Sequence, residues 1–238
     1  MDIVILAAGK GTRLLPFTKT QPKPLLKFGD SFVIELLLKS LPEKAKKVII
    51  VIDYLGNEII KAIGNQYQSL EVSYVWQDEK LKGTLGALLS SKKQIESDNF
   101  LAICSDNLYS KDSLTDLTEI PNSYLVVKVT NEQKKDKYPV AKLSMWQIKN
   151  SNQVLLDAGA WYLNKDFFNA PKIQVEAGNE LGIPHSMKAL SDNSGFNYLP
   201  IETNYWYPLG NKTEVIIAEN ELGIKSNFAT TEVDTLLS

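Results

Sequence analysis

The chain of 238 residues is 44% hydrophobic and carries a formal net charge of -2, which suits a protein with a sizeable core. The weak charge argues against a nucleic-acid partner, and no apolar run reaches the length of a membrane span. A single cysteine, Cys104, excludes an internal disulfide framework and a cysteine metal cluster. Because the N-terminus lacks a secretory pattern, we expect a cytoplasmic protein. Homo-oligomerisation stays open.

Apolar runs alternate with helical periodicities through the first hundred residues. Buried strands are predicted at residues 3–6, 48–52, 72–75 and 100–104. Helices are predicted between them at residues 32–41, 57–63 and 83–91. This alternation predicts an α/β fold with a parallel, doubly wound sheet.

After Asp106 the alternation ends. Strands are predicted at residues 124–129, 140–143 and 158–163, and helices at residues 180–190 and 213–222. The second half is therefore of mixed architecture. Since no linker rich in Gly, Ser or Pro divides the chain, we predict a single domain, residues 1–238, with halves at 1–110 and 111–238.

The loop after the first strand combines small residues with two cations. Gly9 and Gly11 leave the backbone bare, and Arg13 and Lys23 follow in a segment that prolines keep from becoming a helix. Loops at the carboxyl ends of parallel strands bind ligands, and bare N–H groups beside cations can hold phosphate. Neither the P-loop pattern nor the dinucleotide pattern fits, since Leu14 stands where the latter needs its third glycine.

The whole loop resembles the signature of the sugar-1-phosphate nucleotidyltransferases, L-A-A-G-x-G-T-R-L, P-x-T and P-K-P-L. Here these strings are residues 6–14, 16–18 and 22–25. The resemblance implies a glycosyltransferase-A-like α/β/α sandwich with a mostly parallel mixed central sheet. It also implies an enzyme that joins a nucleoside triphosphate to a sugar 1-phosphate with Mg²⁺, giving an NDP-sugar and pyrophosphate.

The same resemblance assigns roles within the loop. It implies that the nucleotide is contacted by Leu6, Ala7, Ala8, Gly9, Gly11, Thr12 and Arg13. Arg13 would hold the β- and γ-phosphates, and Lys23 would bridge the α-phosphate and the incoming sugar phosphate. We do not expect the Lys23 side chain to contribute to packing of the loop, which is flanked by prolines.

Gln77 and the Gly83-Thr84 pair follow the third predicted strand in the string WQDEKLKGTLGA. The family pattern here is a glutamine, a short loop, then G-T and a helix, and it implies contact with the nucleotide base. An amide can donate and accept on one base edge, and glycine permits close approach. Taken without the signature loop, residues 77–84 would be read only as a polar loop before a helix.

Asp106 leaves the fourth predicted strand in the string SDN, where the family has G-D-N. A carboxylate at this edge can hold a Mg²⁺ that also binds phosphate oxygens. Asp106 is thus the predicted metal ligand and, with Arg13 and Lys23, one of three predicted catalytic residues. The alternative is an aspartate that caps the next turn.

The acceptor half matches less closely. Gly159 lies in a string that resembles A-x-G-x-Y, and Glu180 in one that resembles G-E-x-x-L; both are expected to face the sugar phosphate. Lys149 is the nearest match to the lysine of the family's E-K-P loop, with a solvated lysine as the alternative. His185, the only histidine, is expected to be structural.

One departure from the pattern concerns the metal. The family reads W-x-D-x-G-T near its C-terminus, and residues 206–211 read WYPLGN, so Pro208 replaces the second metal carboxylate. Asn211 or another oxygen could substitute. The departure leaves two hypotheses, an enzyme or a nucleotide-binding regulatory module without turnover, and neither base nor sugar follows from the sequence.

Overall fold

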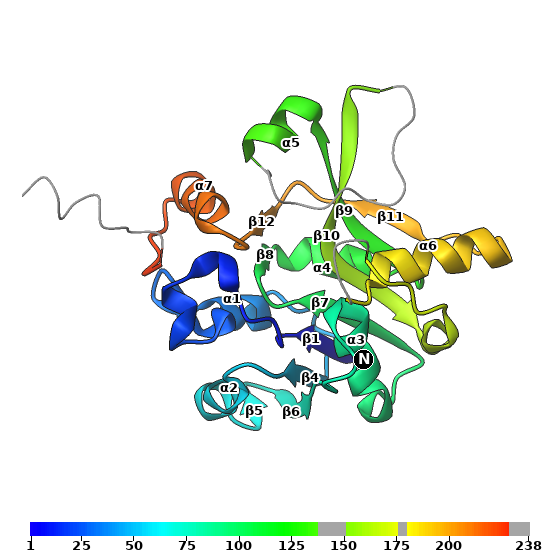
Figure 1. Ribbon diagram of the computed structural model, residues 1–238, viewed down its shortest axis with the longest axis horizontal. Helices are drawn as coiled ribbons and strands as arrows, with labels where there is room; N and C mark the ends of the chain where they lie inside the picture. The colour runs from blue at the N-terminus through cyan, green and yellow to red at the C-terminus, as the bar shows by residue number, and fades with distance from the viewer. Residues whose placement is uncertain (138–150, 176–179, 229–238) are drawn as a thin grey trace, which may run out of the picture.

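The computed structural model describes residues 1–137, 151–175 and 180–228. It places helices on both faces of one central sheet (Figure 1). The sheet contains β1 (Asp2–Leu6), β4 (Lys47–Ile52), β5 (Gln66–Tyr67), β6 (Leu70–Trp76), β7 (Asn99–Cys104), β9 (Ser123–Thr130), β10 (Gln153–Asn164) and β11 (Leu199–Glu202). Two small two-stranded sheets pair β2 (Lys27–Phe28) with β3 (Ser31–Phe32), and β8 (Asn107–Tyr109) with β12 (Trp206–Pro208).

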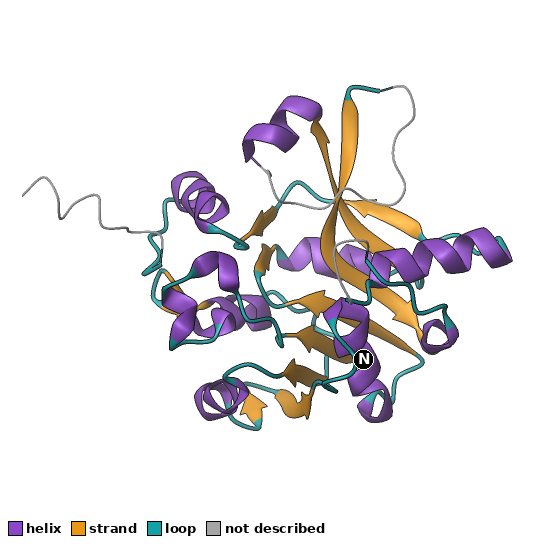
Figure 2. Cartoon of the chain, viewed as in Figure 1, coloured by secondary structure: helices purple, strands orange, loops and turns teal. Residues whose placement is uncertain are grey.

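The strand order is β11-β9-β10-β7-β1-β4-β6-β5. β7, β1, β4 and β6 run parallel, as the alternation in the first half predicts. β10 then lies antiparallel between β7 and β9, so the second half makes the sheet mixed (Figure 2). The predicted fold class, an α/β/α sandwich with a mostly parallel mixed sheet, is confirmed. Both halves share this sheet, and the single-domain organisation itself stays a prediction.

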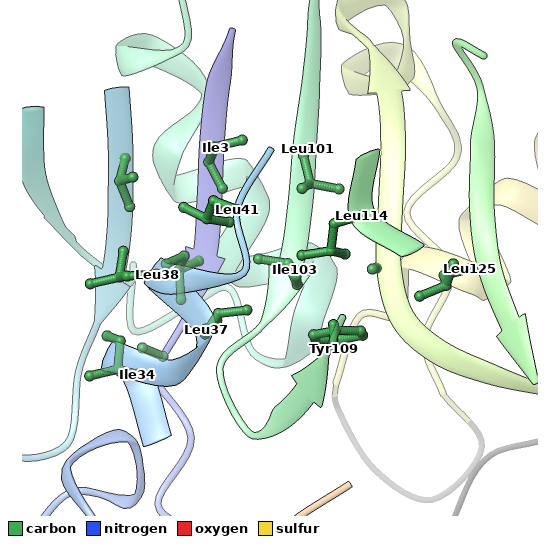
Figure 3. Packing of buried hydrophobic residues seen from close by; sticks show 14 of the residues in the cluster. Ile3, Ile34, Leu37, Leu38, Leu41, Leu101, Ile103, Tyr109, Leu114 and Leu125 are labelled. Atoms are coloured by element: carbon green, nitrogen blue, oxygen red, sulfur yellow. The ribbon is translucent and has the colours of Figure 1, made fainter. Parts of the chain in front are cut away.

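Successive side chains of the central strands point to opposite faces and so build two cores. Ile3 and Ile5 pack with α1 (Val33–Lys39), α2 (Gly56–Ile63) and α4 (Lys111–Leu117). Figure 3 shows this core, with Leu41, just after the end of α1, beside Ile3. Val4 and Leu6 pack with α3 (Gly83–Ser91) and α6 (Ile183–Ser194) on the other face. Strands buried on both faces explain the unbroken apolar runs.

A third, smaller core supports the loop after β1. This loop contains three short 3₁₀ turns, Thr12–Leu14, Phe17–Lys19 and Lys23–Leu25. Leu14 and Leu26 pack with Val215 of α7 (Lys212–Leu222) and with the fully buried Phe228. The signature loop is therefore braced by the last described residues of the chain.

The structure corrects some predicted elements. The helix predicted from residue 180 begins at Ile183, because Gly182 adopts an extended conformation and Pro184 occupies the first turn, where proline is tolerated. α4 was not predicted; the Ser110 side chain caps it by accepting from the Ser113 N–H. α5 (Asn131–Lys137) follows β9 directly. The strand predicted at 140–143 lies outside the described residues.

Within the described part, no helix has both the length and the apolar character needed to cross a membrane.

Candidate active site

A cavity of about 590 Å³ opens at the carboxyl ends of the parallel strands. The signature loop, the ends of β4, β6 and β7, and the start of α3 contribute to its lining. Glu180 and Gly210, from the second half of the chain, complete it. This is the position at which open α/β sheets bind ligands, and the size suits a small molecule.

Most residues predicted to contact a nucleotide line this cavity. From the signature loop these are Leu6, Ala8, Gly9, Gly11, Thr12 and Arg13. Ala7 instead packs in the core, and its N–H extends the β1–β4 ladder by donating to the Val51 carbonyl at 2.9 Å. Gly11 has φ +63°, and a Cβ there would lie 2.9 Å from the Thr18 methyl carbon. Only glycine fits at this turn of the loop without strain and without a clash with Thr18.

Lys23 and Asp106 form an ion pair inside the cavity, with 2.5 Å between Lys23 Nζ and Asp106 Oδ2. Lys23 is only 8% exposed, so the expectation that its side chain would not pack the loop is wrong; the ion pair draws it inward. Burial acts to raise the pKa of the Asp106 carboxyl. The Lys23 charge and hydrogen bond, together with Arg13, outweigh burial and hold that pKa below its usual value. Asp106 is therefore ionised and about a third of its side chain stays open.

Gln77 lines the cavity, and its amide nitrogen forms hydrogen bonds with the loop that follows it. Nε2 donates to the Leu81 carbonyl and, at 3.5 Å, to the Gly83 carbonyl. These two bonds leave the amide oxygen over as an acceptor. Gln77 thus both orders its own loop and presents an acceptor.

Gly83 joins the two halves of the site. It has φ +83°, and a Cβ there would lie 2.5 Å from the Leu181 carbonyl oxygen. The close approach allows a backbone bridge between Lys82 and Glu180, with the Leu181 N–H donating to the Lys82 carbonyl at 2.8 Å. Glu180 reaches the cavity through this bridge and not through a helix. Thr84 also lines the cavity.

Gly159 lies at a bulge in β10 with φ +73°. A Cβ there would lie 3.1 Å from Asn107 Nδ2 and 3.2 Å from Cys104 Sγ, so Gly159 packs against the strand end that carries Asp106. It does not itself line the described cavity. Lys149 lies outside the described residues.

Pro208 stands beside the predicted metal site. It pairs with Asn107 in the β12–β8 ladder, and the next N–H, of Leu209, donates to the Asp106 carbonyl at 2.8 Å. Asn211 is already used as the N-cap of α7, where its Oδ1 accepts from the Glu214 N–H at 3.1 Å.

No group of three or more His, Cys, Asp or Glu side chains in the described segments could cage a metal. The donor set fits a Mg²⁺ held by Asp106, phosphate oxygens and water.

Some lining residues were not predicted, among them Lys10, Asp53, Lys82 and Gly210. Asp53 directly follows a predicted strand, so its position at the ligand edge could have been inferred. Gly210 carries no such signal, because it lies almost two hundred residues after the loop that it faces.

Residues 3–223 match the family model described as Nucleotidyl transferase. The chain therefore belongs to the nucleotidyl transferase family, and the resemblance to sugar-1-phosphate nucleotidyltransferases is confirmed.

Similar proteins agree with this assignment. The "Bifunctional protein GlmU" of Methanococcus maripaludis is 25% identical over 228 residues, covering 92% of this chain and 54% of its own length. The "Bifunctional sugar-1-phosphate nucleotidylyltransferase/acetyltransferase" of Sulfurisphaera tokodaii is 29% identical, covering 91% and 54%. The chain thus spans about half the length of these relatives. A solved Bacillus anthracis protein in complex with a sucrose has the same fold, with 19% identity, coverage of 93% and 94%, and a TM-score of 0.72.

Proposed function

We propose that the protein is a sugar-1-phosphate nucleotidyltransferase, which makes an NDP-sugar and pyrophosphate from a nucleoside triphosphate and a sugar 1-phosphate. One observation carries the proposal: Lys23 and Asp106 are paired in the cavity that the signature loop lines. The name of the S. tokodaii relative supports the same acceptor class.

The reaction needs positioning and charge neutralisation more than proton transfer. An oxygen of the sugar phosphate, already ionised at neutral pH, attacks the α-phosphorus, and the bond from that phosphorus to the bridging oxygen of the β-phosphate breaks. Pyrophosphate leaves with that electron pair. Arg13 holds the β- and γ-phosphates and then the pyrophosphate, while Lys23 contacts the α-phosphate and the incoming phosphate.

Mg²⁺, when bound, supplies further neutralisation of phosphate charge, and Asp106 would hold it. Asp106 suits this role because its carboxylate is ionised and partly open to the cavity. The ion pair with Lys23 keeps both charges in place before any ligand arrives.

Specificity would come from the other walls of the cavity. The Gln77 amide oxygen accepts from a base edge beside the Gly83 backbone. Glu180 accepts hydrogen bonds from sugar hydroxyls, and Gly159 and Lys149 are the further acceptor-side candidates. Neither the base nor the sugar is assigned.

Pyrophosphate release tests the proposal, measured with ATP, CTP, GTP, UTP and dTTP against a set of hexose and N-acetylhexosamine 1-phosphates. We expect release with one preferred pair, dependent on Mg²⁺. Pro208 favours one second candidate, a binding module without turnover. Triphosphate binding with no release from any acceptor would select that module.

A further inference from the structure

A buried carboxylate lies close to Arg13 at the start of α7. Glu214 is 3% exposed, and its Oε2 accepts from the Gly210 N–H at 3.0 Å. Its Oε1 is also buried and has no hydrogen-bond partner among the described residues. A buried carboxylate with an oxygen left over is costly unless other charges compensate it.

Arg13 supplies such a charge across Gly210. A Cβ built on Gly210 would lie 2.7 Å from Glu214 Oε2 and 3.6 Å from Arg13 Nη2, so both groups converge on one bare stretch of backbone. Arg13 makes no ion pair within 4.0 Å in the described part of the chain. Arg13 acts electrostatically on two acidic groups, Asp106 and Glu214, and Glu214 is the one that approaches the same Gly210 backbone.

The charges of the cavity act on Glu214 as well. Burial raises the pKa of this carboxyl, while the Gly210 N–H, Arg13 and Lys23 favour its ionised form and Asp106 opposes it. Glu214 therefore belongs electrostatically to the cavity, although it does not line it. The sequence resemblance gave Glu214 no role, and the second metal carboxylate is missing nearby at Pro208.

We propose that Glu214 is a positioning residue, whose carboxylate draws the Arg13 guanidinium against Gly210 and holds it ready for the phosphates of a triphosphate. The proposal rests on the proposed function, because it needs a phosphate ligand. An oriented arginine loses less side-chain entropy on binding than a free one. The alternative is that Glu214 only caps α7 through the Gly210 N–H.

Glu214→Gln separates these two roles, since the amide oxygen can still accept from Gly210 while the charge is gone. Binding is measured by calorimetry with tripolyphosphate, which has no base or sugar, and with the triphosphate that binds best. We expect both dissociation constants to rise about fivefold or more, a size typical of coupled sites. If Glu214 only repelled the anionic ligand, the dissociation constants would instead fall, because Glu214→Gln removes a negative charge.

The double mutant with Arg13→Ala completes the test. If Glu214 acts through Arg13, Glu214→Gln should change binding little once Arg13→Ala is present. Glu219→Gln is the matched control: Glu219 is a buried carboxylate of the same helix, but its Oε1 accepts from the Ser226 N–H. Glu219→Gln should leave tripolyphosphate binding unchanged.

Unchanged or tighter binding by folded Glu214→Gln would overturn the proposal, and so would an equal loss in the Arg13→Ala background. Should Glu214→Gln fail to fold, Glu214→Asp replaces it in the same cycle. The expected loss of binding is then smaller, because aspartate keeps the negative charge but its shorter side chain places the carboxylate farther from Arg13. Binding without pyrophosphate release would defeat the proposed function alone. A wild type that binds neither probe would overturn both.

Discussion

Lys23 and Asp106 neutralise each other before any ligand binds, at 2.5 Å. A triphosphate and its cation would have to take over these charges, with phosphate replacing Asp106 beside Lys23 and the cation replacing Lys23 beside Asp106. Both charged groups would therefore already stand in the cavity when a ligand binds, and the ion pair between them would open.

Lys23→Ala should lower kcat by about 10²–10³-fold, the usual cost of losing one preorganised charge in the transition state. The variant also leaves Asp106 without its partner, so we expect a lower melting temperature. Steady-state pyrophosphate release and a thermal melt check the two effects. Lys19→Ala, in the same loop but outside the cavity, is the control and should change neither. A near-normal rate for Lys23→Ala would remove Lys23 from the mechanism.

Gln77→Ala should reduce discrimination among triphosphates more than it reduces the rate with the best one. The variant loses the proposed acceptor for the base edge and the bonds to the Leu81 and Gly83 carbonyls, while the proposed phosphate contacts stay. The readout is relative kcat/KM across five triphosphates. Gln66→Ala, on β5, is the control. An unchanged ranking and spread would show that Gln77 only orders its loop.

Pro208→Asp should strengthen metal binding, because a second carboxylate would stand beside Asp106. We expect the Mg²⁺ concentration at half-maximal activity to fall about tenfold, equivalent to ~1.4 kcal/mol. Direct Mn²⁺ binding, followed by electron paramagnetic resonance, gives a readout independent of activity. Equal midpoints for both proteins at low Mg²⁺ would show that the wild-type site is already complete.

For single residues, the sequence predicts positions that depend on the neighbouring strand. The signature loop, Gln77 and Asp106 all follow strands whose carboxyl ends share one edge, so their convergence could be predicted. The approach of Glu214 to Arg13 could not, because it depends on how α7 packs against a loop from the other end of the chain. The burial of Lys23 was missed for the same reason, since its partner is 83 residues away.

Among the elements, the contact between the start of α3 and residues 180–181 organises the site. Gly83 lets two backbone segments meet there, which brings Glu180 to the cavity. The expected helix start at residue 180 missed this, because a backbone bridge between distant segments leaves no periodicity in the sequence. The central strands were predicted well, since burial on both faces gives continuous apolar runs.

Gly83→Ala should destabilise the protein beyond the cost of its backbone conformation. A positive φ alone costs a non-glycine residue about 1–3 kcal/mol, and here the added Cβ also meets the Leu181 backbone. Gly223→Ala is the matched control, with φ +66° and nothing within 4 Å of the added carbon. Urea unfolding should show a larger loss of unfolding free energy for Gly83→Ala. Equal losses would mean that the two segments separate easily.

For the whole molecule, the small core behind the signature loop connects the two ends of the described chain. Phe228 is fully buried there with Leu14, Leu26 and Phe28. Phe228→Ala should cost about 3–5 kcal/mol of unfolding free energy, as for other buried phenylalanines. It should also weaken triphosphate binding, because the loop loses its support. Phe196→Ala, at a side chain that is 39% exposed, should change both little.

This connection has a consequence for the order of events on the ribosome. β1, β4 and β6 are made early and can pair soon after they emerge. The signature loop is made early too, but Phe228 and the bond from the Gly29 N–H to the Lys225 carbonyl are supplied about two hundred residues later. A nascent chain halted before α7 would therefore carry the complete signature loop without the residues that pack behind it. Under the proposed function, triphosphate binding would then begin only after α7 and Phe228 have been made and have packed behind this loop.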